Sequence, residues 1–257
     1  MLKIKWMRFA LFLTLILMAE VAQATPSTTY WTPATTDIQP YGVLHIGVDN
    51  YFTVFRQGKD GGGSLPTDVG LTMGVLPFAK LQMEVGIDLL EPSDDPLFFN
   101  AKLGTPEHSL FKESPALNLG IFNVGTKENV TNQNIVYGLI GKSIPFIGRI
   151  HAGLYTGNSR ALVDKNGEKE NTGFMIGFDR PLMRVKDKDG KVLYDKLVLA
   201  ADYASGKNAI GGGGVGIYYY FTKDISLLTG PVWFNEEAIN GKWKWTIQLD
   251  INWDILK

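Results

Sequence analysis

The sequence predicts an all-β fold, a transmembrane antiparallel up-and-down β-barrel of about twelve strands, give or take two, preceded by a cleaved signal peptide. Three observations indicate this fold. Residues 243–255 alternate strictly between apolar and polar side chains, and most stretches before them show the same period of two. The chain has no cysteine, so no disulfide framework stabilises it. After residue 24 no apolar run approaches the ~20 residues of a membrane-spanning helix.

The closing stretch is the clearest strand. Its apolar positions are Trp243, Trp245, Ile247, Leu249, Ile251, Trp253 and Ile255. Its polar positions are Lys244, Thr246, Gln248, Asp250, Asn252 and Asp254. Because successive side chains of a strand point to opposite faces, this strand has one apolar and one polar face. Aromatic ends with aliphatic residues between them are typical of a membrane-crossing strand, which needs ~9–11 residues. A strand of a soluble sandwich or lipocalin-type barrel is the alternative.

Residues 1–24 have the three parts of a secretory signal peptide. Lys3, Lys5 and Arg8 form the basic part, an apolar run follows, and Ala-Gln-Ala at 22–24 is the small-residue cleavage site. Removal of this peptide takes away three basic residues and one Glu, which leaves 22 Lys and Arg against 25 Asp and Glu, a net charge of −3. The lack of a basic excess argues against nucleic acid as a partner.

Residues 25–40 are rich in Thr and Pro and show no period, which predicts an extended periplasmic lead-in segment. Insertion of Tyr30 and Trp31 into the mouth of the barrel is the alternative. The predicted organisation is therefore a signal peptide over 1–24, this lead-in segment, and an outer-membrane barrel over 41–257.

The strands of the barrel follow from the alternation and from the turn residues between them. We expect them at about 41–55, 69–75, 81–89, 99–104, 117–122, 134–142, 149–155, 174–179, 197–203, 214–221, 225–234 and 243–255. The dipeptides Asn166-Gly167 and Asp189-Gly190 are hairpin-type turns. The sixth and eleventh of these strands show the weakest alternation.

The lengths of the links give an independent test, because barrels of this kind have short periplasmic turns and longer outer loops. With both termini periplasmic, the links after the second, sixth and tenth strands are periplasmic, and they are short. The outer links are longer and more polar. The links after the fourth and eighth strands are long for periplasmic turns.

These features resemble those of Gram-negative outer-membrane β-barrel proteins over nearly all of the mature sequence. The signal peptide, the period of two, the aromatic girdle and the amphipathic last strand carry the resemblance, which identifies a class without assigning a family. The girdle consists of Trp243, Trp245, Trp253, Tyr219 and Phe221. The resemblance implies an outer-membrane location, with outer-membrane lipid and the barrel-insertion machinery as partners. Such proteins usually end in an aromatic residue, whereas this chain ends at Lys257.

Charged side chains of both signs fall on the lumenal parity. They are Glu84, Asp88, Lys102, Arg149, His151, Asp202, Lys244 and Asp250. In a channel such side chains set selectivity, and in a closed barrel they pair with each other. Barrels of about eight strands are filled by side chains and porins of 16–18 hold a water channel, so a barrel of about twelve leaves both a narrow pore and a plugged one open. Inward glycines such as Gly74, Gly177, Gly214 and Gly216 fit a small barrel that keeps space open or packs around an inserted loop.

We expect a narrow, passive, porin-like channel for small polar solutes or ions. A non-conducting structural or surface-binding barrel that works through its outer loops is the first alternative, and a lipid-modifying or proteolytic barrel enzyme is the second. The three histidines lack a local Ser or Asp signature, so the sequence predicts no catalytic site, and neither a metal nor a cofactor is expected. The motif Gly211-x-Gly213-x-x-Gly216 opens a strand and not a helix, which removes the phosphate cradle of a nucleotide site.

Overall fold

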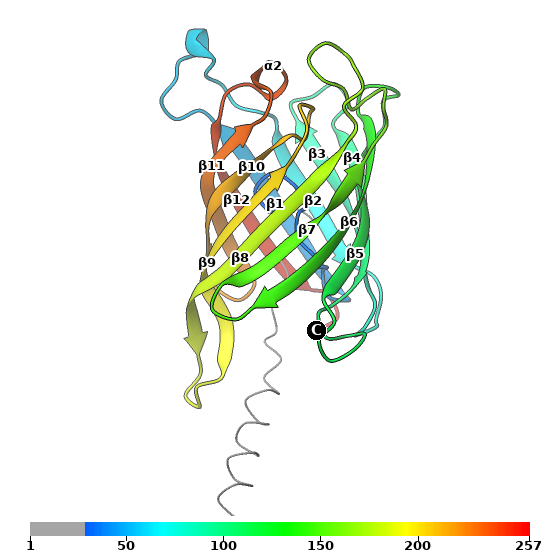
Figure 1. Cartoon of the computed structure of the whole chain (residues 1–257). Helices are drawn as coiled ribbons and strands as arrows, with labels where there is room; N and C mark the ends of the chain where they lie inside the picture. Colours follow the sequence, from blue (N-terminus) through cyan, green and yellow to red (C-terminus); the bar gives the residue numbers. More distant parts are fainter. Residues whose placement is uncertain (1–28) are drawn as a thin grey trace, which may run out of the picture.

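The computed structural model describes residues 29–257, so the predicted signal peptide lies outside the described residues. Twelve antiparallel strands form one closed barrel in which each strand pairs with its neighbours in sequence (Figure 1). The strands are β1 (Val43–Phe52), β2 (Thr67–Gly74), β3 (Gln82–Glu91), β4 (Leu97–Thr105), β5 (Ala116–Gly125), β6 (Asn132–Ile144), β7 (Gly148–Thr156), β8 (Thr172–Lys186), β9 (Val192–Ala204), β10 (Gly212–Tyr220), β11 (Ile225–Phe234) and β12 (Lys244–Asp254). The predicted fold class is confirmed.

The barrel closes where β1 pairs with β12. The pairing is continuous from Val43 opposite Asp254 to Phe52 opposite Trp245, so neither strand has a free edge over this length. Two short helices, η1 (Gly58–Asp60) and α2 (Glu237–Asn240), lie in links between strands. Within residues 29–257 no helix has the length and apolar character needed to cross a membrane.

The two ends of the barrel carry different links. The C-terminus lies at the end where the links after even-numbered strands lie, here called the C-terminal rim (Figure 1). The other end, here called the long-loop rim, carries the links 53–66 and 157–171. At the C-terminal rim β8 and β9 project as a hairpin (Figure 1). The eighth link looked long in the sequence because these strands continue past their predicted ends, and only residues 187–191 connect them.

The outward faces of the strands are apolar. Exposed aliphatic side chains come from strands all round the barrel and include Val69, Leu89, Leu119, Ile140, Ile176, Ile217 and Ile247. Of the predicted girdle, Trp243, Trp253, Tyr219 and Phe221 are exposed, and Trp245 lies on the same outward parity. Trp243 and Trp245 stand toward the long-loop rim and Trp253 toward the C-terminal rim, so aromatic residues flank the aliphatic surface at both ends.

The two strands of weakest alternation have apolar residues on their inner faces as well. On β6, Ile135, Tyr137 and Leu139 are buried in one apolar cluster inside the barrel. On β11, Leu228 and Val232 are buried in a second cluster. A strand that is apolar on both faces shows no period of two, which explains why its sequence does not alternate.

Candidate functional site

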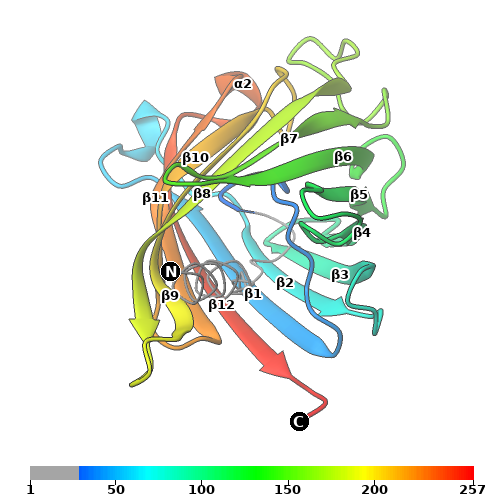
Figure 2. The same ribbon diagram turned by 60° about the horizontal axis from the view of Figure 1, so that its bottom comes forward.

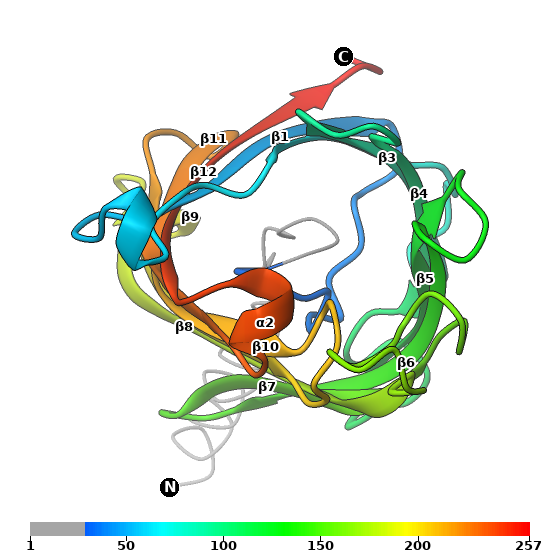
Figure 3. The same ribbon diagram turned by 90° about the horizontal axis from the view of Figure 1, so that it is seen from above.

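Residues 29–39, here called the lumenal segment, lie inside the ring of strands (Figures 2 and 3). Each of them is buried except Trp31, which is half-buried. This differs from the extended periplasmic lead-in that we expected, and it agrees with the alternative in which Tyr30 and Trp31 enter the barrel. The physical reason is that the polar groups of the segment have partners on the lumenal wall, which a segment without periodicity does not reveal.

A wall carboxylate holds the first part of the segment. Oδ2 of Asp202 on β9 accepts hydrogen bonds from the backbone N–H groups of Tyr30, Trp31 and Thr32, each at 2.8 Å. Oδ1 accepts a fourth from the N–H group of Gly214 at 3.0 Å. Hydrogen bonds to an ionised group are about twice as strong as neutral ones, so these four donors offset part of the cost of burying the carboxylate. We call this contact the Asp202 anchor.

Aromatic packing surrounds the Asp202 anchor. The Tyr30 carbonyl accepts hydrogen bonds from the Tyr51 hydroxyl at 2.8 Å and from Gln248 Nε2 at 3.0 Å. A Cβ at Gly214 would lie only 2.5 Å from the Cβ of Tyr30, so this position must remain glycine for the ring to fit. Burial, and then the charge of Asp202, raise the pKa of the Tyr30 phenol, so Tyr30 stays neutral.

A segment carboxylate holds the second part. Asp37 makes a two-pronged ion pair with the guanidinium group of Arg149 on β7, and Arg149 Nε also pairs with Asp179 Oδ2 at 2.9 Å. Lys102 Nζ donates to the Asp37 carbonyl at 2.9 Å. Bidentate Arg–carboxylate pairs are geometrically specific as well as strong. We call this contact the Asp37 anchor.

A buried ion pair lies beside the Asp37 anchor. Lys102 Nζ is 3.4 Å from Glu84 Oε1, and both side chains are at most 1 % exposed. Glu84 Oε2 accepts the backbone N–H group of Gln39 at 2.7 Å. Glu84 therefore binds both Lys102 and the end of the segment. The additional hydrogen bond offsets part of the cost of burying the two charges.

His151 connects the segment to Asp179. Its Nδ1 lies 3.1 Å from the Thr36 backbone nitrogen and 3.0 Å from Thr36 Oγ1, and its Nε2 lies 3.0 Å from Asp179 Oδ2. The atoms are those of a hydroxyl–imidazole–carboxylate relay. The backbone N–H group of Thr36 already donates to Nδ1, however, and both residues are buried. The arrangement therefore acts as a clamp on the segment.

Wall glycines make room for the segment. A Cβ at Gly177 would overlap the Ala34 carbonyl oxygen, and one at Gly74 would overlap the Pro40 carbonyl oxygen. Both glycines belong to the inward set singled out in the sequence. Their role is to let the backbone of the segment approach the wall closely.

A second part of the lumen is acidic and free of these contacts. Asp49, Asp68 and Asp88 lie on the inner faces of β1, β2 and β3 and are partly exposed. Asp49 stands directly opposite Asp68, and Asp88 accepts a hydrogen bond from Asn100 at 2.7 Å. Among residues 29–257 none of the three carboxylates forms an ion pair or a hydrogen bond to the lumenal segment. We call these three residues the acidic wall.

The predicted lumenal residues therefore separate into three groups. Those at the lumenal segment are Glu84, Lys102, Arg149, His151 and Asp202. Asp88 belongs to the acidic wall. Asp250 pairs with His45 at 3.4 Å, and Lys244 is buried near the long-loop rim. No group of three or more His, Asp or Glu side chains in the described part of the chain is arranged to hold a metal ion.

Sequence reasoning missed several residues of the site. Asp37 and Thr36 were assigned to the lead-in, and Asp179, Asp49 and Asp68 were not singled out. For the last three a signal exists, because each shares the inward parity of its strand. For Asp37 the only available signal is a lone acid in an apolar and Thr-rich stretch that directly precedes the barrel.

No family model matches the chain, and no curated protein matches it. The solved structures that are similar to the chain include the following three. One, from a study of in-meso crystallization of membrane proteins, has a TM-score of 0.47 and 10 % identity, with 83 % of this chain and 85 % of that chain covered. The second is Salmonella typhi OmpF in complex with daunomycin, with a TM-score of 0.36, 9 % identity and coverage of 82 % and 96 %. The third, OmpT, an outer membrane protein of Vibrio cholerae, has a TM-score of 0.33, 10 % identity and coverage of 82 % and 98 %.

Proposed function

We propose that this chain is an outer-membrane β-barrel that acts as a narrow channel with a preference for small cations, with its lumen narrowed by its own lumenal segment. The acidic wall is the observation that carries the proposal. Charged side chains inside a membrane protein are expensive and are a sign of solute or ion pathways. Rings or rows of Asp and Glu are the usual device of cation pathways.

The outer surface supports the membrane placement. Its exposed aliphatic side chains would be unfavourable in water over so large an area, whereas in lipid they need no partner. Closure of the sheet satisfies the backbone hydrogen bonds of every strand, as a bilayer requires. Delivery by a signal peptide and assembly by the barrel-insertion machinery belong to the same proposal.

The balance of accessible charge supports the cation preference. The basic side chains that face the lumen at the segment are neutralised, Arg149 by Asp37 and Asp179 and Lys102 by Glu84. Within residues 29–257 no Lys or Arg pairs with a carboxylate of the acidic wall; the basic group near Asp88 is His45, which pairs with Asp250 at 3.4 Å. A solute passing beside the segment therefore meets three carboxyl groups, which raise the local concentration of cations when they are ionised.

A non-conducting barrel is the second candidate, and the burial of the lumenal segment favours it. Tyr30 and Ala34 have no exposed surface, and two apolar clusters pack inside the same lumen. In that case the segment acts as a permanent core, and function belongs to the outer loops.

Single-channel recording in a planar bilayer separates the two candidates. We expect discrete steps from the refolded mature protein and a reversal potential of cation sign in a KCl gradient. Replacing Asp49, Asp68 and Asp88 together by Asn should shift that potential toward zero, because the negative wall is removed. The matched control replaces three Asp residues on the links, Asp94, Asp95 and Asp189, and should leave the potential unchanged. Inserted, folded protein without steps would contradict the channel and favour the permanent core.

A disulfide shows whether the segment must move. A Cβ at Gly141 would overlap Oγ1 and lie 2.9 Å from Cγ2 of Thr36, so Thr36→Cys with Gly141→Cys places two thiols within reach of a bond. The same Cβ would lie 2.7 Å from Nδ1 of His151, so the His151 ring has to shift slightly in this variant. The native chain has no other cysteine to interfere. Conductance that persists in the oxidised variant indicates a path beside the segment, and conductance that returns only on reduction indicates that the segment has to leave.

A further inference from the structure

We infer that the long-loop rim binds a phosphate group of an outer-leaflet glycolipid through Arg56, Lys59 and Lys242. We call these three residues the basic rim patch. The inference rests on the membrane placement proposed above, in which this rim faces outward, and not on conductance. It concerns the outer side of the barrel beside β12, which neither the lumenal segment nor the acidic wall uses.

The link between β1 and β2 carries most of the patch to the outside of the barrel. Seen from above, this link with η1 lies outside the ring of strands, on the side of β11 and β12 (Figure 3). Its residues Val54 and Phe55 are exposed, Phe55 to 87 %. A link that stands outside the ring at the end of an apolar outer face is placed beside the lipid headgroups.

Trp243 fixes the position of Arg56. The Arg56 guanidinium carbon lies 4.9 Å from the centre of the Trp243 ring, and Nη2 donates to the Trp243 carbonyl oxygen. Trp243 is a girdle residue on the outward parity of β12. Because a girdle tryptophan lies at the level of the headgroups, a cation stacked on it is held at the level of the lipid phosphates.

Lys242 lies against the same link as Arg56. Its Nζ donates to the Asp60 carbonyl oxygen at 3.4 Å, and its Cδ would lie 3.6 Å from a Cβ at Gly61. Lys59 is exposed within η1, directly before Asp60. The contacts of Lys242 with the link, and those of Arg56 with Trp243, therefore join cations from two links in one patch.

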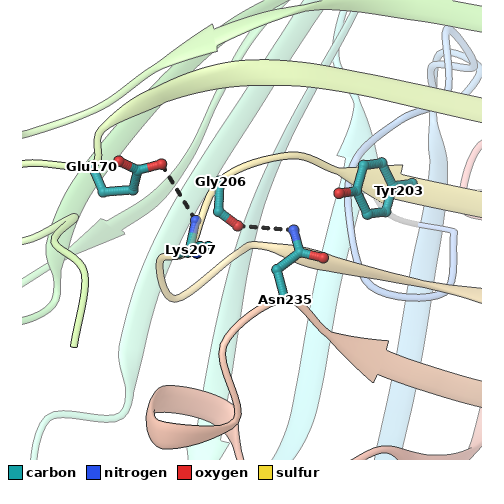
Figure 4. A pocket seen from close by; sticks show the side chains of 5 residues that line it. All are labelled: Glu170, Tyr203, Gly206, Lys207 and Asn235. Carbon is teal, nitrogen blue, oxygen red and sulfur yellow. Dashed lines mark hydrogen bonds between the residues drawn. The ribbon is translucent and has the colours of Figure 1, made fainter.

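The patch has an excess of positive charge. Within residues 29–257 none of its three cations forms an ion pair, and Asp60 is the single carboxylate in the link between β1 and β2. On another side of the same rim the backbone N–H group of Lys207 donates to Glu170 Oε1 at 3.4 Å, which places a carboxylate beside that lysine (Figure 4). A phosphate is therefore favoured at the patch and not at Lys207, because Arg and Lys bind phosphate and a carboxylate repels it.

The aromatic residues beside the patch favour a lipid over a soluble anion. Phe55 and Trp243 present apolar surface next to the cations, and a lipid covers such surface whereas inorganic phosphate does not. The outward leaflet of a Gram-negative outer membrane consists of phosphorylated glycolipid. The leaflet, and not a contact to the sugar, thus sets the choice of lipid.

Native mass spectrometry of the detergent-solubilised full-length mature barrel tests the site. The probes are lipid A, lipid A from which the phosphates have been removed, and inorganic phosphate. We expect the wild-type barrel to retain lipid A at least about tenfold better than its dephosphorylated form, since ~1.4 kcal/mol of charge-assisted contact corresponds to a factor of ten. Inorganic phosphate should not displace lipid A. Replacing Arg56, Lys59 and Lys242 together by Gln should remove the preference for the phosphorylated form.

A matched control separates the patch from the overall charge of the rim. Replacing Lys127, Arg160 and Lys207 together by Gln removes three exposed cations from other links of the same rim and should leave retention unchanged. Compact migration of unheated protein in electrophoresis verifies that each variant is folded. Equal retention of lipid A with and without its phosphates, displacement by inorganic phosphate, or equal behaviour of the two triple variants would each overturn the site. A barrel that fails only these lipid tests and still inserts and conducts leaves the proposed function standing.

Discussion

At the Asp202 anchor the carboxylate belongs to the barrel wall, whereas at the Asp37 anchor it belongs to the lumenal segment. The wall carboxylate of Asp202 accepts backbone N–H groups, which are present whatever side chains the segment carries. The segment carboxylate of Asp37 needs one particular partner, the guanidinium group of Arg149. The Asp202 anchor therefore recognises the backbone of the segment, and the Asp37 anchor recognises a side chain of the segment.

This difference has a consequence for how each anchor fails. At the Asp202 anchor one substitution in the wall leaves several buried donors without an acceptor, and buried unpaired donors are expensive. At the Asp37 anchor loss of Asp37 leaves Arg149 with its second partner, Asp179. We therefore expect a wall substitution at Asp202 to weaken binding of the segment more than a segment substitution at Asp37.

The largest expected effect is that of Asp202→Ala. The substitution removes the acceptor of four N–H groups and should cost about 3–5 kcal/mol of segment binding, as the loss of one partner from a buried charged network does. The measurement uses Ala34→Cys as a reporter. A membrane-impermeant thiol reagent should label Cys at this position at least about a hundredfold faster in the Asp202→Ala variant than in the barrel that keeps Asp202. Ala34 has no exposed surface in the native barrel.

The control for this measurement is Asp49→Asn in the same reporter background. Asp49 is also a lumenal carboxylate, but it makes no hydrogen bond to the segment among the described residues. Its labelling rate should equal that of the parent. If Asp202→Ala labels no faster than this control, the segment is held by packing alone and the Asp202 anchor is not the main contact.

A smaller effect is expected at the Asp37 anchor. Arg149→Gln leaves the carboxylate of Asp37 buried without a cation, and because Arg149 is 17 % exposed the loss should be about 2–3 kcal/mol, toward the lower end for buried pairs. Asp37→Asn should cost less, because Arg149 keeps Asp179. The measurement is the rate of thiol labelling of a barrel with Ile38→Cys. Ile38 is 4 % exposed in the native structure.

The order of the two variants is the informative result. Equal labelling for Arg149→Gln and Asp37→Asn would mean that Asp179 does not support the arginine. The double variant should lose less than Arg149→Gln alone, because no Asp37 carboxylate is then left buried without a cation.

The barrel itself could be predicted from the sequence because its strands obey a simple rule. Each wall residue faces lipid or lumen by parity, so Glu84, Arg149 and Asp202 were placed on the lumenal side without any knowledge of their partners. The alternation of β6 and β11 was the weakest because the inner faces of these strands also pack against apolar groups. Such packing is a tertiary contact, and the alternation of one strand cannot predict it.

The contents of the lumen could not be predicted in the same way. The lumenal segment has no regular secondary structure of its own, and its contacts join residues that are far apart in the chain, such as Tyr30 with Asp202. Alternation gives no information on such a segment. The inward glycines were a real signal of an inserted group, yet they did not say which part of the chain is inserted.

The smallest effect, and the one that tests the stretch between the anchors, is that of Gly177→Ala. The added Cβ would overlap the Ala34 carbonyl oxygen, and overpacking of this kind typically costs about 1–3 kcal/mol. Because both anchors remain intact, the segment can bulge locally instead of leaving, so we expect about a tenfold rise in labelling of Ile38→Cys and not more. Gly138→Ala is the matched control, since a Cβ there meets only the Asn118 carbonyl oxygen at 3.7 Å. If Gly177→Ala raised the labelling rate as much as Asp202→Ala, the whole segment would leave as one unit and the two anchors would not act separately. Backbone recognition at Asp202 and side-chain recognition at Asp37 would then not differ in their contributions to the binding free energy of the segment.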